Sequence, residues 1–325
     1  MKNTAWSWAV VAALMSACGG ELSQAPDSTD PMEESPEASE EISAYGVSAN
    51  GRNLNGRGLN GRNLNGRELN GHALSNAHLG SLALDAVWLE GSSLVSRTSN
   101  GQVLRGAALV GAVLGDTTGR SPRLRIDAAA AEGDIWQYTV SYLSQTGWTP
   151  LCPSDTGQAL AAIPLSGRWD YRQGVPGGGA HIAEPGTITF ACTDGALAKC
   201  ASFGYAPWRQ TMRCTSEGCG TVSLASYHQA CTRMVRADYC GDGRSFTRDG
   251  TLINLYDAVG IQLDTESWTT EAEWDTQGAR CISHRRLGGS AAPRCARNLY
   301  PADCGALSHF SGGTLLMTEF DGSNQ

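Results

Sequence analysis

The sequence predicts a β-rich α+β domain stapled by disulfides, preceded by a short pentapeptide-type β-solenoid or by a flexible repeat arm. Three observations lead to this fold class. Leucine recurs every five residues over 50–114, strand-like alternation outnumbers helical periodicity over 121–325, and ten of the eleven cysteines lie between residues 152 and 304. The segment 121–325, roughly 200 residues, is long enough to build one substantial core.

Residues 1–18 have the features of a bacterial export signal. Lys2 supplies the charged start, and the apolar run WSWAVVAALM that follows is too short to span a bilayer. The end of the segment, LMSAC, resembles a lipobox, in which the cysteine, here Cys18, is lipidated and becomes the new N-terminus. Met15 stands where leucine is more usual, and a plain secretory signal cleaved nearby is the alternative. No other stretch approaches 18 apolar residues, so membrane contact depends on this lipid.

Residues 19–49 form an acidic tether that we expect to be disordered. Between residues 19 and 44 there are eight acidic residues, no basic ones and three prolines, with almost nothing to bury. This segment accounts for the whole formal net charge of −8, so the acidity says nothing about an active site. The negative net charge argues against nucleic acid as a partner, because proteins bind its phosphates through basic surfaces.

Residues 50–114 consist of five-residue repeats that begin NGRNL, NGRGL, NGRNL. Neither a helix nor a flat strand has this period, whereas a four-sided coil with five residues per face does. The pattern resembles pentapeptide-repeat proteins, whose right-handed β-helix stacks the leucines inside. That family places a small residue two positions before the leucine, and four positions comply: Ala77, Ser92, Ala107 and Ala112. Four earlier positions hold arginine, which a dry core excludes, so we expect these copies to be frayed, differently wound or extended over the domain: Arg52, Arg57, Arg62 and Arg67.

Several strands and one short helix are predicted in the globular domain, residues 121–325. The long run LRIDAAAAEGDIWQYTVSYLSQTGWTPLC divides into strands at two turn dipeptides, Glu132-Gly133 and Thr146-Gly147. IPLSGRWDY, TITFAC and LLMTEF are further strand candidates. A short helix through ALAKCASFGY is expected to be capped by Thr193 or Asp194.

The segment 223–257 is the best defined part of the chain. Apolar residues at helical spacing predict an amphipathic helix with Ser223 as N-cap and Gly241 as the left-handed C′ residue. The buried face of this helix is expected to hold Leu224, Tyr227, Cys231, Met234 and Val235. After two Asp-Gly turns, the alternating TLINLY predicts a half-buried strand.

The same segment contains the tetrapeptide Ala237-Asp238-Tyr239-Cys240, within VRADYCGDG and followed by TRDGTLIN. These strings resemble the ADYC domain, a family found in predicted envelope and secreted proteins of myxobacteria. ITFACTDGALAKCASFGYAPW and IPLSGRWD are similar to the same family, and the resemblance covers roughly residues 122–320. It implies a cell-envelope or secreted location, and it implies no activity, substrate or catalytic residue.

The cysteines predict five disulfides formed outside the cytoplasm, because their number is even and an export signal precedes them. The ten residues are Cys152, Cys192, Cys200, Cys214, Cys219, Cys231, Cys240, Cys281, Cys295 and Cys304. Ten cysteines allow roughly 945 connectivities, which the sequence leaves open, although proximity favours Cys214 with Cys219. Zinc is the competing use of that pair, but no second matched pair accompanies it, so no metal site is expected.

A catalytic role is conceivable for His228, which lies three residues before Cys231 and could pair with it while Asp238 orients the ring. Three residues is also ordinary neighbour spacing on a helix, and a structural role is the favoured interpretation. A secreted hydrolase that uses His228 and an aspartate of the 238–257 segment is the alternative function.

The carboxylates of Asp238, Asp242 and Asp249 are weak candidates for calcium, which takes oxygen ligands from such Asp/Gly loops. The loop does not match an EF-hand, and aspartate is also a common turn residue. Asp238 could instead pair with Arg233 or Arg236 near the end of the helix. A carboxylate there is disfavoured by the helix dipole unless a cation compensates it.

Seven tryptophans in or near the domain could stack on sugar rings if exposed, which would make the protein a carbohydrate-binding module. Such residues more often fill the core and shield disulfides. They are Trp88, Trp136, Trp148, Trp169, Trp208, Trp268 and Trp274.

Taken together, the sequence predicts a cell-envelope lipoprotein, anchored through Cys18 to the outer membrane on its periplasmic or surface face. A binding or structural role is favoured over catalysis. The expected partner is an envelope protein or polysaccharide, and no cofactor is expected.

Overall fold

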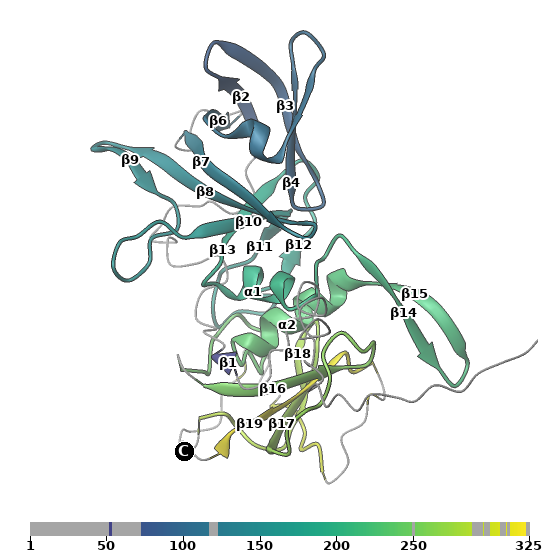
Figure 1. Cartoon of the computed structure of the whole chain (residues 1–325). Helices are drawn as coiled ribbons and strands as arrows, with labels where there is room; N and C mark the ends of the chain where they lie inside the picture. The colour runs from purple at the N-terminus through teal and green to yellow at the C-terminus, as the bar shows by residue number, and fades with distance from the viewer. Residues whose placement is uncertain are drawn as a thin grey trace, which may run out of the picture. The chain divides into compact units, whose positions relative to one another are not determined.

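Two antiparallel sheets, two short helices and two small two-stranded ribbons make up the part of the chain that the computed structural model describes (Figure 1). The described residues are 52–53, 73–116, 123–248, 251–287, 295, 300–305, 310 and 313–322. All of them belong to one compact unit, Glu40–Gln325. The predicted signal and tether lie outside the described residues. No helix within those residues is long and apolar enough to cross a membrane.

The larger sheet has ten strands in the order β13-β10-β8-β7-β6-β2-β3-β4-β5, and β9 pairs with β8. The two turn dipeptides predicted from the sequence separate β7, β8 and β9, which confirms that division. The strands are β2 Leu74–Leu79, β3 Leu82–Glu90, β4 Ser93–Thr98, β5 Val103–Arg105, β6 Ala112–Asp116, β7 Leu124–Glu132, β8 Ile135–Ser144, β9 Gly147–Pro150, β10 Ala161–Ser166 and β13 Ile188–Cys192. One turn of 3-10 helix, Gly106–Leu109, links β5 to β6.

The later repeat copies form antiparallel hairpins of this sheet, so the prediction of a four-sided coil is wrong over residues 74–116. Stacked coils place parallel strands side by side, whereas here the chain reverses every ten or eleven residues. The reversals occur at glycines with positive φ: Gly80, Gly91 and Gly101. Three leucines ten residues apart, one on each of β2, β3 and β4, are buried in one core cluster: Leu74, Leu84 and Leu94. The copies at 54–72 lie outside the described residues.

The repeats and the domain after residue 121 share one sheet. β6 pairs with β7 in the register Leu114↔Leu124, so the leucine of the last repeat sits beside the first strand of the domain. Both leucines belong to the same core cluster. The backbone of β1, Arg52–Asn53, pairs with a strand of the other sheet. That pairing agrees with early repeats extended over the domain.

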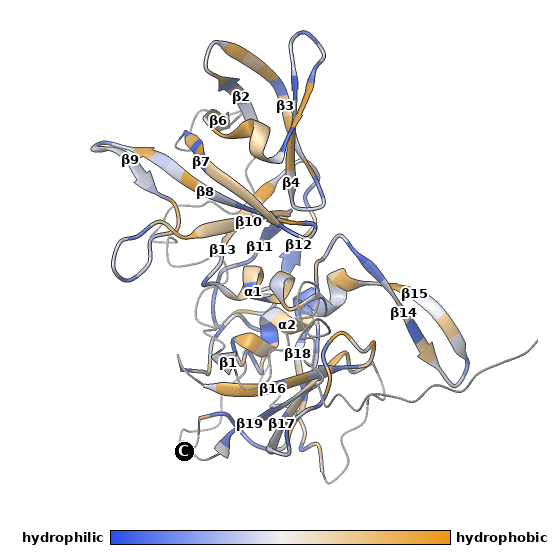
Figure 2. Ribbon diagram, viewed as in Figure 1, coloured by the Kyte–Doolittle hydropathy of each residue, from blue (hydrophilic) through white to orange (hydrophobic). Residues whose placement is uncertain are grey.

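The smaller sheet has the order β1-β16-β19-β17-β18. Its strands are β16 Leu252–Asp257, β19 Leu316–Phe320, β17 Thr269–Asp275 and β18 Gly278–Ile282. The predicted TLINLY and LLMTEF strands are therefore confirmed, and they pair with each other through Leu255↔Thr318. Apolar residues run along β16 (Figure 2). Two of them, Ile253 and Leu255, pack in one core with the central helix.

That helix, α2, spans Leu224–Val235, and Ser223 caps it by accepting a hydrogen bond from the Ala225 N–H at 3.2 Å. All five residues predicted for its buried face are buried. The shorter helix, α1, spans Ala196–Ser202. Its N-cap is Gly195, which makes no side-chain capping bond, so the prediction of a Thr193 or Asp194 cap is wrong.

Five disulfides join the ten cysteines, as their even number predicts. Cys214–Cys219 is the pair that proximity favoured. It lies in the ribbon formed by β14 Gln210–Thr215 and β15 Gly218–Ser223; the other small ribbon is β11 Arg168–Trp169 with β12 His181–Ile182. The remaining pairs, which only the folded chain decides, are Cys152–Cys192, Cys200–Cys231, Cys240–Cys295 and Cys281–Cys304.

Candidate functional site

The central helix ends in a left-handed residue that the sequence did not indicate. Ala237 has a φ of +50°, and its N–H donates to the Met234 carbonyl at 2.9 Å. The next N–H, that of Asp238, donates to the Arg233 carbonyl at 2.8 Å. These two bonds form the Schellman arrangement that satisfies the last carbonyls of a helix. The prediction of Gly241 as the C′ residue is therefore wrong, although Gly241 also has positive φ.

This turn carries a buried charge cluster, which we define as Arg233, Arg236, Asp238, Asp242 and Arg244. Asp238 is completely buried, and its Oδ2 accepts a hydrogen bond from Arg233 Nη1 at 2.5 Å. The same carboxylate accepts the backbone N–H groups of Asp242 at 3.0 Å and Gly243 at 2.9 Å. The predicted pairing of Asp238 with a helix arginine is confirmed, and the partner is Arg233.

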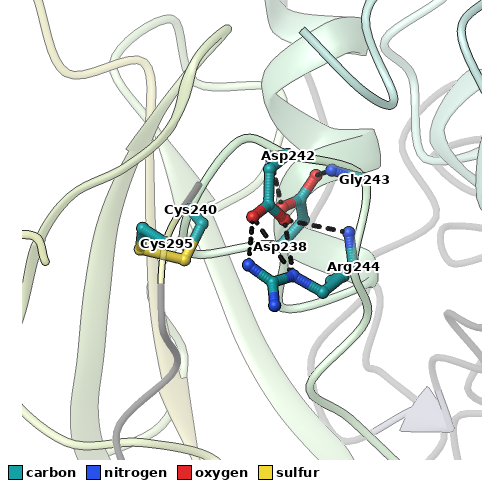
Figure 3. Close-up of a disulfide and its surroundings, with 6 residues drawn as sticks. All are labelled: Asp238, Cys240, Asp242, Gly243, Arg244 and Cys295. Atoms are coloured by element: carbon teal, nitrogen blue, oxygen red, sulfur yellow. Dashed lines mark hydrogen bonds and ion pairs between the residues drawn. A yellow bond between two sulfur atoms is a disulfide. The ribbon is translucent and has the colours of Figure 1, made fainter. Parts of the chain in front are cut away.

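Asp242 and Arg244 form a further ion pair of the cluster (Figure 3). The Asp242 side chain is 2% exposed, and both its oxygens accept hydrogen bonds from the Arg244 guanidinium, which is 34% exposed. Asp242 Oδ1 also accepts the Arg244 backbone N–H at 3.2 Å, which is the turn chemistry expected of aspartate. Figure 3 shows the Cys240–Cys295 disulfide beside this turn.

Burial dominates the electrostatics of the cluster. It raises the pKa of the Asp238 carboxyl, and the neighbouring Arg233 and Arg236 cations oppose this rise. Burial likewise lowers the pKa of the Arg236 guanidinium to about 10. Arg236 Nη2 donates to the Gly243 carbonyl at 2.6 Å, while its Nε and Nη1 have no hydrogen-bond partner among the described residues. Arg233 thus has a hydrogen-bonded carboxylate partner, whereas Arg236 interacts with the charges of Asp238 and Asp242 and the only hydrogen bond of its guanidinium among the described residues is to a backbone carbonyl.

Two other loops contact this turn closely, and each contact involves a glycine: Gly241 of the turn in one case and Gly178 of the loop in the other. A Cβ at Gly241 would overlap the Gln277 carbonyl in the turn between β17 and β18, and the Ala279 N–H donates to the Tyr239 carbonyl at 3.0 Å. The second loop is the one before β12, where the Gly178 carbonyl accepts a hydrogen bond from Arg233 Nη1. The turn is therefore the meeting point of three segments that are distant in sequence.

A second buried ion pair, Arg286–Glu271, also contacts the end of this helix. Arg286 and Glu271 are both fully buried, and they are joined by two parallel hydrogen bonds of 3.0 and 2.9 Å. Arg286 also donates to the carbonyls of Met234 at 3.0 Å and Val235 at 3.3 Å, where a helix C-terminus favours a cation. Tyr239 Oη donates to Glu271 at 2.7 Å, and burial raises the Tyr239 pKa well above its ordinary value.

His228 is not brought together with the cluster. It is 2% exposed, its Nε2 donates to the Leu197 carbonyl at 2.9 Å, and its ring packs against Trp169. Burial lowers the pKa of His228 to about 4, so the ring is neutral at pH 7. Because Cys231 is in a disulfide and Asp238 bonds to other groups, the conceivable Cys–His–Asp arrangement is not formed.

The last aspartate of the 238–257 segment also has a structural role. Asp257 accepts a hydrogen bond from Tyr205 Oη at 2.7 Å and bonds from the backbone N–H groups of Val259, Ile261 and Gln262. It fixes the turn after β16, so it is not poised as a general base for the alternative hydrolase.

The calcium candidates do not converge on an open position. Asp238 and Asp242 direct their oxygens to guanidinium and amide N–H groups, which are donors that a cation would have to displace. Asp249 lies outside the described residues.

The one possible metal-binding group found within the described residues consists of Glu273, Cys281 and Cys304. Its two cysteines form a disulfide, so neither offers a thiolate to a metal. Cys214 and Cys219, the pair weighed for zinc, are also disulfide-bonded to each other.

The tryptophans form no exposed aromatic platform in the described part of the chain. Trp169 and Trp274 are buried, and the other five of the seven considered are partly buried. Several have specific protein partners: Trp208 Nε1 donates to Asp134, and Trp148 stacks under Arg125 with 4.6 Å between the guanidinium carbon and the ring centre. Core filling is the better interpretation of this set.

Glu271 and Arg286, which form the second ion pair, were not identified from the sequence. A glutamate inside the strand TTEAEWD was the only available signal, since a charge on the buried face of a strand requires a partner. The arginine that supplies it lies fifteen residues away in an irregular segment.

A family model for the ADYC domain matches residues 104–288. The match begins within β5 and ends before β19, although β19 lies between β16 and β17 in the smaller sheet. No curated protein and no solved structure matches the chain. Since the matched segment covers more than half of the 325 residues and contains the Ala237–Cys240 turn, the chain belongs to the ADYC domain family.

Proposed function

We propose that this chain is a cell-envelope lipoprotein whose ADYC domain has a binding or structural role and not a catalytic one. The observation that carries the proposal is the internal use of the polar groups in the ADYC turn. Asp238 bonds to Arg233 and two backbone amides, and its burial leaves no oxygen for a substrate. Arg286 and Glu271 likewise bond to each other and to the helix end. These side chains therefore hold loops together.

The location part of the proposal rests on two independent features. Five disulfides in one domain indicate an oxidising, extracytoplasmic compartment. The lipobox-like end of residues 1–18 supports lipidation at Cys18, followed by an acidic tether that carries the domain away from the membrane. We assign the anchor to the outer membrane, and the partner to an envelope protein or polysaccharide.

The anchor is tested by labelling cells with a radioactive or clickable palmitate and isolating the protein. The wild-type chain is expected to carry label and to fractionate with outer membranes. Cys18→Ser should lose both properties while keeping its five disulfides. Label that persists in Cys18→Ser, or an unlabelled wild-type chain released into the medium, would overturn the lipoprotein assignment.

The role is tested with full-length protein in detergent, incubated with bacterial peptidoglycan sacculi or with purified exopolysaccharide. For a polysaccharide-binding protein we expect sedimentation with one of the two and no release of soluble sugars or peptides. Release that disappears in His228→Gln would instead support the hydrolase and contradict the proposal. If neither polymer binds, a protein partner must appear as an adduct of discrete mass after cross-linking in cells. The absence of both results would exclude a binding role.

A further inference from the structure

We propose that the Cys214–Cys219 disulfide is a reversible thiol–disulfide exchange site, open to the thiolate of a protein dithiol or of a small thiol. The other four disulfides serve as fixed structural links. This reactivity is independent of the binding role proposed above.

The position of the two cysteines makes them accessible. They face each other directly in the register of the β14–β15 ribbon, whose strands pair only with each other in the described part of the chain. Figure 1 shows these strands as a separate ribbon that leads into α2. Both cysteines are exposed, as are the four residues of the loop between them. A disulfide can be attacked only when a thiolate reaches one sulfur along the S–S axis, and this exposure provides that approach.

Glycines precede and follow Cys219 in the ribbon. A Cβ at either Gly218 or Gly220 would meet no atom within 4 Å. Because side chains alternate along a strand, these two positions lie on the face of the ribbon opposite Cys219, so that face is open as well.

No other disulfide of the described residues has two exposed cysteines. Two pairs lie in the core, with each of their cysteines at most 2% exposed: Cys152–Cys192 and Cys200–Cys231. Each of the remaining two pairs consists of buried or partly buried cysteines: Cys240–Cys295 and Cys281–Cys304. Rates of exchange depend on access to the sulfur, so these pairs should react far more slowly in the folded protein.

Opening the Cys214–Cys219 bond should leave the fold intact. Neither cysteine belongs to a core cluster, and the ribbon keeps backbone pairs from Gln210↔Ser223 to Thr215↔Gly218. The bond closes a sequence separation of only 5 residues, against 23 to 55 for the others, so it restricts the unfolded chain least. After reduction the two thiols remain opposite each other, which favours closure of the same bond again.

The exchange takes place in two steps. A thiolate of the reductant attacks Sγ of one cysteine and forms a mixed disulfide, while the Cys214–Cys219 bond breaks and the other sulfur leaves as a thiolate that takes up a proton. The second thiolate of a dithiol, or a second molecule of a small thiol, then attacks the mixed disulfide. Two electrons pass to the protein, which ends with two thiols, and the reductant ends as a disulfide.

The test uses the folded full-length protein with three reductants: dithiothreitol, reduced glutathione and reduced thioredoxin. Samples are alkylated with N-ethylmaleimide at intervals, and peptide mass spectrometry gives the rate for each disulfide. We expect Cys214 and Cys219 to be alkylated more than about tenfold faster than any other pair, with unchanged circular dichroism. Faster reaction with thioredoxin identifies a protein dithiol as the preferred reductant, and faster reaction with glutathione identifies a small thiol.

The matched control is Cys214→Ser/Cys219→Ser, which should lose the fast phase and keep the slow rates of the other four disulfides. Since wild-type mapping alone identifies the fast pair, the test stands even if this variant folds poorly. Reaction of another disulfide at a similar rate, or modification of Cys214 and Cys219 only when circular dichroism is lost, would overturn the proposal.

Discussion

Asp238 and Arg233 are joined twice at the end of α2, once through their side chains and once through their backbones. The carboxylate accepts from Arg233 Nη1 at 2.5 Å, and the Asp238 N–H donates to the Arg233 carbonyl at 2.8 Å. The backbone bond exists because Ala237 adopts the left-handed conformation and turns the chain back. The cap that ends the helix therefore also positions the buried ion pair.

The two helix arginines should differ sharply in their contribution to stability. Arg233→Met leaves the Asp238 carboxylate buried without its cation, so we expect a loss of about 3–5 kcal/mol in the free energy of unfolding. Arg236→Met removes a cation with two unbonded donors, so its cost should stay below about 2 kcal/mol. Urea unfolding at pH 7 measures both. Equal losses would mean that Arg236 has a strong partner in solution.

Gly241 should tolerate no side chain. Gly241→Ala combines an unfavourable φ of +62° with overlap of the Gln277 carbonyl, and we expect severe destabilisation or failure to fold. Gly260→Ala is the matched control: its φ is +76° but nothing lies within 4 Å, so it should cost only about 1–2 kcal/mol. Thermal unfolding of the pair separates the two effects. Similar melting temperatures would show that the turn does not press against Gln277.

His228 should make the domain sensitive to acid. Its pKa falls from 6.5 to about 4 on folding, so between these values the unfolded chain binds a proton that the folded chain does not. Stability contributed by this group is complete above pH 6.5 and is lost as the pH falls towards 4, by about 3 kcal/mol. His228→Gln can still donate to Leu197 but does not titrate. Urea unfolding at pH 7 and pH 4 should show a smaller acid loss in the variant; parallel losses would contradict the assignment.

The disulfides should contribute unequally to the free energy of unfolding. Cys200→Ala/Cys231→Ala removes a link between the two helices with a sequence separation of 31. Since this link restricts the unfolded chain, we expect its removal to lower the free energy of unfolding by about 3–4 kcal/mol. The same replacement of Cys214 and Cys219, with a separation of 5, should cost about 2 kcal/mol. Denaturant midpoints under oxidising conditions compare the two variants. A larger cost at the exposed pair would assign it a structural role.

Local features of the chain could be predicted well where they depend on neighbouring residues. The α2 helix began at its predicted N-cap and buried its predicted face, because capping and helical periodicity act within a few residues. Turns at Glu132-Gly133 and Thr146-Gly147 and the strand at 252–257 were predicted for the same reason. The prediction of the helix C-terminus was wrong because it relied on glycine, whereas surrounding contacts hold Ala237 in the left-handed region.

The five-residue repeat was misassigned because its strand pairing, like the conformation of Ala237, depends on contacts beyond the local sequence. The five-residue period marks leucines such as Leu84 and Leu94, which are buried, but also Leu79 and Leu89, which are only partly buried. Such a period does not distinguish parallel coils from antiparallel hairpins. Turns at Gly80, Gly91 and Gly101 selected antiparallel pairing, and long-range pairing of β6 with β7 joined the repeats to the domain.

By itself, the sequence determined the family, the even set of domain cysteines, the β-rich class and the helix on which the ADYC turn is built. Only the tertiary structure decided which cysteines pair, that Arg286 compensates Glu271, and that His228 and Asp238 serve separate structural ends. The physical reason is the range of the forces involved. Caps and periodicity act over a few residues, whereas pairing of buried charges and sulfurs depends on which distant segments the core brings into contact.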